Sequence, residues 1–227
     1  MGFAGILFLV AFAALIFVFI RARKTSQLAY IDKYRFHSAI RNKLSDKYPH
    51  LSPSDVNLVF DGLREYFHIC HKANKRMVAM PSQAVDMAWH EFILFTKAYD
   101  NFCQKALGRF LHHTPTEAMK TATLAQDGIK RAWRLSCAKN GINPATPSKL
   151  PLLFEIDSRL NIPDGFKYSL NCRDKSSPNY ADGYCAGHIS CGGGCGGSSG
   201  SASDSGGSFF GDSGDSGGCS GGCGGGD

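Results

Sequence analysis

The chain opens with an unbroken apolar run. Residues 2–20, GFAGILFLVAFAALIFVFI, contain no charged or strongly polar side chain. A helix needs roughly 20 such residues to cross the hydrocarbon core of a bilayer. The run therefore predicts a transmembrane anchor over residues 1–24 that ends in a basic stop. A cleaved signal peptide is the alternative, but it requires a basic segment before the run and a small-x-small site after it, and RARK follows here instead.

The charges next to this run predict its orientation. Arg21, Arg23 and Lys24 follow it, whereas only the terminal amine precedes it. Because Lys and Arg beside a span tend to remain in the cytoplasm, we expect the amino terminus outside and the following domain in the cytoplasm. Cytosolic thiols usually stay reduced, and nine cysteines are an odd number. We therefore expect free thiols or metal ligands rather than a disulfide framework.

The other end of the chain has a different composition. Residues 176–227 are rich in Gly, Ser and Cys, carry −5 and contain no Lys or Arg, which leaves +11 on the rest of the chain. Such a segment buries too little apolar surface to offset its ordering entropy, so it predicts a flexible tail. The basic body could lie against anionic lipid headgroups or bind its own acidic tail. Nucleic-acid binding is not expected, because no recognition motif accompanies the basic residues.

The middle of the chain, residues 25–175, predicts an all-α bundle. Apolar residues recur at helical spacing, and no segment alternates convincingly with the period of two that marks a strand. Ser52 before Pro53, and Ser82 after Pro81, provide helix starts, and Gly108 provides a stop. The expected helices cover residues 25–48, 52–74, 82–107, 114–141 and 151–160.

Several motifs resemble the glycine-rich-domain-protein-like family. They are WHEFILFTKAYDNFC with GRFLHH, and later LPLLFEIDSRLNIPDGFKY. The most specific positions are Asp86, Trp89 and His90, followed by Tyr99, Cys103 and the His112–His113 pair. The resemblance covers most of residues 52–168 and extends to the Gly/Cys tail. It implies this domain layout and marks these positions, but it implies no reaction.

Asp86 and His90 form the first half of a candidate metal site. They lie four residues apart on the polar side of the expected helix, so packing does not require them. If the preceding helix is antiparallel, His68 and His71 fall at the same level. Three imidazoles and one carboxylate suit zinc or another divalent ion, with the carboxylate able instead to orient an imidazole. The alternative is a solvated helix face with an Asp–His pair.

His112 and His113 are expected to form a separate polar cluster. A continuous helix from His90 to Leu107 advances roughly 25 Å at about 1.5 Å per residue. The five further residues to His112 span at most about 17 Å. A centre that joins the double histidine to His90 is therefore disfavoured on this geometry.

The remaining thiols offer weaker candidates. Cys191, Cys195, Cys219 and Cys223 form two pairs with three residues inside each, a spacing that zinc sites tolerate, although the surrounding glycines make ordering costly. Cys103 could act as a nucleophile, but it falls on the apolar side of its helix, where thiols are usually inert.

Two functions follow from these features. The first is a membrane-anchored cytosolic binding or scaffolding module whose tail contacts a protein partner. The second is a metal-dependent enzyme, hydrolytic in type, that uses His68, His71, Asp86 and His90. No Gly-x-Ser-x-Gly, phosphate-binding or dinucleotide-binding motif points to another reaction.

Overall fold

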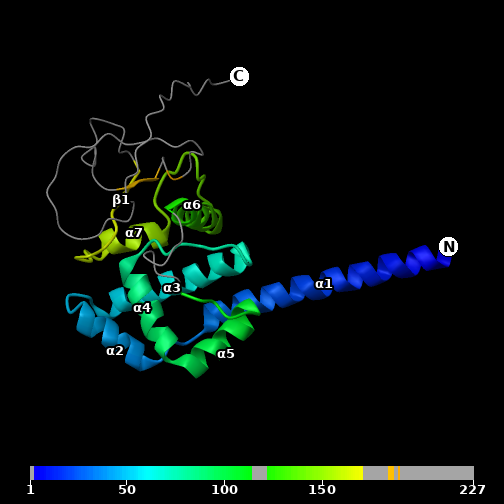
Figure 1. Cartoon of the computed structure of the whole chain (residues 1–227), viewed down its shortest axis with the longest axis horizontal. Helices are drawn as coiled ribbons and strands as arrows, with labels where there is room; N and C mark the ends of the chain where they lie inside the picture. The colour runs from blue at the N-terminus through cyan, green and yellow to red at the C-terminus, as the bar shows by residue number, and fades with distance from the viewer. Residues whose placement is uncertain (1–2, 114–121, 171–183, 187–188, 190–227) are drawn as a thin grey trace, which may run out of the picture.

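The computed structural model describes residues 3–113, 122–170, 184–186 and 189, and the structural statements below concern these residues. Most of the predicted tail, including Cys191, Cys195, Cys219 and Cys223, lies outside them. The first helix, α1 (Phe3–Lys33), is long and apolar enough to span a membrane. Its apolar part is exposed and projects away from the body (Figure 1).

The body confirms the all-α expectation. Within the described residues, six further helices pack around one hydrophobic core, and a pair of two-residue parallel strands, which the sequence did not predict, follows α7. The elements are α2 (Ser38–Lys47), α3 (Pro53–Ala73), α4 (Gln83–Leu94), α5 (Thr96–Leu107), α6 (Ala122–Lys139), α7 (Leu152–Arg159), β1 (Tyr168–Ser169) and β2 (Tyr184–Cys185).

Two of the expected helices are broken. The expected helix over residues 25–48 is wrong: α1 continues from the apolar run to Lys33, and α2 begins only at Ser38, with His37 Nδ1 accepting a hydrogen bond from the amide of Ala39. The expected helix over residues 82–107 is also wrong. Phe95 leaves helical geometry at φ −80° and ψ 58°, which ends α4 and starts α5 in a new direction (Figure 1).

The core is built around α3. Its first turn is closed by the predicted cap at Ser52, which forms a capping box with Asp55. Apolar residues then recur along the helix, and α3 contacts α1, α4, α6 and α7. Phe67 lies at the centre, with its ring centroid 4.7 Å from that of Phe102 and 6.3 Å from that of Phe92. This aromatic cluster fixes α4 and α5 against α3.

The cysteines differ in state. Cys70, Cys103 and Cys137 are free and buried, as expected for reduced thiols. Cys185 is disulfide-bonded, which contradicts the expectation that the thiols stay reduced. A disulfide is typical of an oxidising compartment, so this bond disagrees with the cytoplasmic orientation that the basic stop predicts.

Candidate metal centre

The first part of the site lies on α4. Ser82 caps the helix by accepting a hydrogen bond from the amide of Val85. One turn later Asp86 and His90 project from the same face, and Asp86 Oδ2 lies 3.2 Å from His90 Nδ1. This is the i,i+4 pairing that the sequence predicted, near the positive end of the helix dipole.

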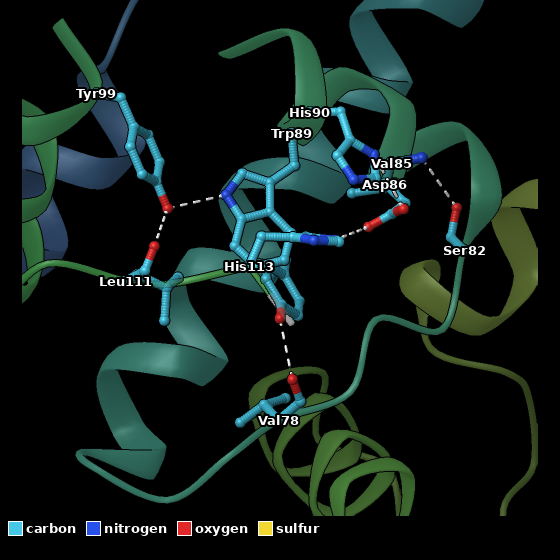
Figure 2. Close-up of polar contacts among 10 residues, drawn as sticks. Val78, Ser82, Val85, Asp86, Trp89, His90, Tyr99, Leu111 and His113 are labelled. Atoms are coloured by element: carbon cyan, nitrogen blue, oxygen red, sulfur yellow. Dashed lines mark hydrogen bonds and ion pairs between the residues drawn. The ribbon is translucent and has the colours of Figure 1, made fainter. Parts of the chain in front are cut away.

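The third member is His113, which arrives from the loop after α5. Its Nε2 lies 3.1 Å from Asp86 Oδ1, and its ring centroid is 4.1 Å from that of His90 (Figure 2). One ligand atom from each of the three residues lies within 4.8 Å of the others. The structure therefore contradicts the expectation that His113 lies in a cluster separate from His90. The break at Phe95 turns α5 back, so that the loop returns to the start of α4.

Hydrogen bonds from α5 hold this loop in place. The Tyr99 hydroxyl donates to the carbonyl oxygen of Leu111 at 2.5 Å and accepts from Trp89 Nε1 at 3.1 Å (Figure 2). The His113 ring then packs edge-on against the Trp89 indole, with centroids 4.6 Å apart. Trp89 and Tyr99 are buried, so the position of His113 depends on the rigid core.

The geometry fits a divalent ion with nitrogen and oxygen ligands. Ligand atoms about 2.0–2.1 Å from a tetrahedral zinc ion are separated from one another by about 3.3 Å. His90 Nδ1 and His113 Nε2 lie 3.2 and 3.1 Å from different oxygens of Asp86, and one ligand atom from each residue lies within 4.8 Å of the others, so a bound ion would draw the three ligand atoms closer together. Without a metal, the imidazole N–H of His113 donates to Asp86 Oδ1, and His90 Nδ1 lies 3.2 Å from Asp86 Oδ2; with a metal, both nitrogens would bind the ion without their protons.

One side of the cluster faces solvent. The His90 side chain is 48% exposed, whereas those of Asp86 and His113 are 21% and 15% exposed. Three protein ligands with one open side are the arrangement that catalytic zinc sites use to bind water or substrate. Closed structural sites instead use four protein ligands.

The structure does not bring His68 and His71 to this cluster. His68 Nε2 lies 2.6 Å from Asp32 Oδ1, and His71 Nε2 lies 3.0 Å from Gln27 Oε1. Both partners belong to α1. Burial lowers the pKa of His68, against the effect of Asp32, and burial together with Lys72 lowers the pKa of His71. These imidazoles connect α3 to α1 and are not shared with Asp86.

The relative direction of α3 and α4 explains this separation. The two helices meet at the predicted level, but through aromatic rings, with Phe67 and Trp89 centroids 6.4 Å apart. Earlier on both helices, a Cβ placed on Gly62 would lie 2.8 Å from Val85 Cγ2. Because an earlier residue of α3 contacts an earlier residue of α4, the two helices do not run in opposite directions. The antiparallel packing that the sequence predicted is therefore wrong; the helices cross (Figure 1).

The other sequence candidates lie elsewhere. The exposed His112 packs on Phe110, with ring centroids 4.8 Å apart, so the double histidine is divided between the cluster and the surface. Burial raises the pKa of the Cys103 thiol, which disfavours it as a nucleophile.

Comparison with known proteins places the domain within one family. The model of a family described as UCP032817-like matches residues 26–189, which include α2 to α7 and the whole Asp86–His90–His113 cluster. No curated protein and no solved structure matches the chain. The apolar part of α1 precedes the matched region.

Proposed function

The chain belongs to the UCP032817-like family, and we propose that it is a membrane-anchored helical binding module that holds a divalent metal ion between Asp86, His90 and His113. The observation that carries the proposal is the convergence of these three side chains from two separate segments. Zinc fits best, because imidazole and carboxylate together suit borderline divalent ions. In this site His113 takes the place of His68 and His71, which the sequence-based hypothesis named as ligands.

The rest of the chain supports an anchored module. The apolar part of α1 has the length and composition of a membrane span, and the basic stop favours a cytoplasmic body. We also propose that the chain is related to glycine-rich-domain proteins. Its acidic tail would bind a protein partner. In this arrangement the tail extends from a body that the span holds at the membrane surface.

A second function is favoured by the exposed side of the cluster. A divalent ion held by three protein ligands keeps a position for water, whose pKa it lowers enough to produce a nucleophile near neutral pH. With His90 48% exposed, a substrate could approach that position from solvent. The corresponding activity is hydrolysis, and it depends on the same three ligands.

Cobalt titration of the full-length chain in detergent tests the metal site. Co²⁺ takes the place of zinc and reports its ligands in the visible spectrum. We expect about one equivalent bound, with a nitrogen and oxygen spectrum and no thiolate charge-transfer band. His113→Ala and Asp86→Asn should each weaken binding by about tenfold or more, because each removes a ligand.

His112→Ala is the matched control, because it removes the neighbouring imidazole, which contacts Phe110 instead of the cluster. His71→Ala provides a second control from the set that the sequence predicted. Both variants should retain full binding, and circular dichroism establishes that every variant is folded. Equal binding by His113→Ala and the parent chain, or a thiolate spectrum that points to the tail, would refute the proposal.

A further inference from the structure

The body is joined to the apolar span without a hinge. α1 is one helix from Phe3 to Lys33, and its last turns enter the core, where Ile31 is fully buried. Leu28 and Tyr30 pack against the same core. A span fixed in a bilayer therefore fixes one face of the body against the membrane surface. This inference rests on the anchor in the proposed function.

Two helices of the body direct their carboxyl ends toward that face. Along α3, His68 pairs with Asp32 and His71 pairs with Gln27, so α3 runs antiparallel to the end of α1. At the end of α5, a Cβ on Gly108 would lie 3.4 Å from both Arg23 Nη2 and Gln27 Nε2. The two helix ends are joined, because Arg109 donates a hydrogen bond to the carbonyl oxygen of Asn74.

The rise of α1 places these ends at the depth of the lipid headgroups. Each headgroup layer is about 5–8 Å thick beyond the hydrocarbon core. If the core ends near Ile20, Arg23 and Lys24 lie about 5–6 Å beyond it and Gln27 about 10 Å beyond it. Lys72 and Ala73, the last residues of α3, continue toward the membrane, since α3 is antiparallel to α1, and Lys75 and Arg76 follow in the turn after the helix.

This end of the body is strongly basic. The segments 20–27, 70–77 and 104–110 contain no Asp or Glu. Its cations come from α1, from the end of α3 and the loop after it, and from the residue after Gly108. We call this set the basic end: Arg23, Lys24, Lys72, Lys75, Arg76 and Arg109. All are exposed except Arg109, which is partly buried.

We propose that the basic end binds the anionic headgroups of phospholipids and so holds the body directly on the membrane surface. Charge complementarity and position support lipid as the occupant, because each Lys or Arg near an anionic surface adds attraction and the span keeps that surface permanently adjacent. Lys72 and Arg109 also complement the negative ends of α3 and α5. Lys75 and Arg76 lie beyond the last residue of α3, and Arg76 Nε donates a hydrogen bond to the carbonyl oxygen of Ala73 at the helix end.

Hydrogen exchange on the full-length chain in liposomes tests the proposal. The liposomes contain phosphatidylcholine alone or with phosphatidylserine, and amides in segments 70–78 and 105–111 are followed by mass spectrometry. With phosphatidylserine we expect their exchange to slow by about fivefold. Replacing Lys75 and Arg76 with Glu should abolish the slowing. Lys43→Glu with Lys47→Glu, an equal charge change on exposed residues of α2, should preserve it.

Two controls separate failure of the membrane anchor from failure of lipid binding by the basic end. The chain should float with both kinds of liposome, because the span does not need anionic lipid; failure to float with phosphatidylcholine alone would overturn the anchor and this inference together. Flotation with equal exchange in both liposomes would overturn this inference alone. A variant with Asn at Asp182, Asp204, Asp212, Asp215 and Asp227 removes the charge of the tail. Protection of these segments in phosphatidylcholine alone that is lost in this variant would assign the basic end to the tail and also overturn lipid binding.

Discussion

His113 is positioned by residues that do not touch the proposed ion. The Tyr99 hydroxyl connects Trp89 on α4 to the carbonyl of Leu111, two residues before His113. Both aromatic side chains are buried, so neither hydrogen bond can be replaced easily by water. The geometry of the proposed metal site thus depends on one phenolic hydroxyl in the core.

Tyr99→Phe should therefore affect both stability and metal binding. The variant leaves the Leu111 carbonyl and the Trp89 N–H without their partner, which costs about 1–3 kcal/mol of unfolding free energy. Cobalt affinity should fall by about tenfold, as for other losses of supporting hydrogen bonds around a metal ligand. Chemical denaturation and cobalt titration measure the two effects. Tyr30→Phe, on α1, is the control, and unchanged cobalt affinity in Tyr99→Phe would show that the hydroxyl does not position His113.

His71 should make the stability of the domain depend on pH. Burial lowers its pKa below the usual 6.5, so the unfolded chain takes up a proton before the folded chain does. Stability is therefore complete above pH 6.5 and declines as the pH falls toward the lower pKa of the folded state. Thermal denaturation at pH 7.5 and at about pH 5.5 should show a fall in Tm that is smaller in His71→Gln. An equal fall in both proteins would exclude His71 as its source.

At the scale of the elements, the break at Phe95 determines which histidines meet. The sequence predicted Asp86 and His90 on one helical face, because i,i+4 spacing is local, and it predicted the caps at Ser52 and Ser82 for the same reason. It did not predict the break, because neither Gly nor Pro stands there and no side chain caps α5. Phe95 instead stacks on His37 from the α1–α2 connection, with centroids 5.0 Å apart. A contact between residues so distant in sequence carries no local signal.

The direction of α4 depends on Asp157 of α7. Its carboxylate accepts hydrogen bonds from the Ser82 hydroxyl at 2.7 Å and from the amides of Gln83, Ala84 and Phe166. Asp157 is 3% exposed, and burial raises its pKa, although these hydrogen bonds oppose the rise. The carboxylate therefore fixes the helix start that carries Asp86.

Asp157→Ala should be strongly destabilising. It leaves several buried donors unsatisfied, which costs about 3 kcal/mol or more. Asp157→Asn keeps the volume and one acceptor oxygen, so it should cost less. Urea denaturation of the two variants measures the difference. Equal, small losses would show that solvent replaces the carboxylate and that α7 does not anchor α4.

At the scale of the whole molecule, the continuous α1 joins its apolar part and the body in a single unit. The apolar run predicted the span, but it gave no sign that the same helix continues into the core as far as Lys33. The orientation of this unit is the point on which the chain's features disagree. Arg21, Arg23 and Lys24 favour a cytoplasmic body, whereas the disulfide at Cys185 favours an oxidising compartment.

Protease accessibility resolves this disagreement. We expect protease added to intact cells to leave the body uncut and to degrade it in inside-out vesicles, because the basic stop follows the span. A thiol label applied after denaturation, with and without reduction, reports the state of Cys185. Degradation of the body in intact cells would reverse the orientation and agree with the disulfide.

The central claim is that three side chains, brought together by a bend between two helices, hold one metal ion. Anomalous diffraction at the zinc absorption edge, from crystals of the full-length chain grown with zinc, locates the ion directly. The account predicts a peak within bonding distance of Asp86, His90 and His113, about 2.0–2.2 Å from each ligand atom. A peak at the tail cysteines with none between these three residues would contradict it.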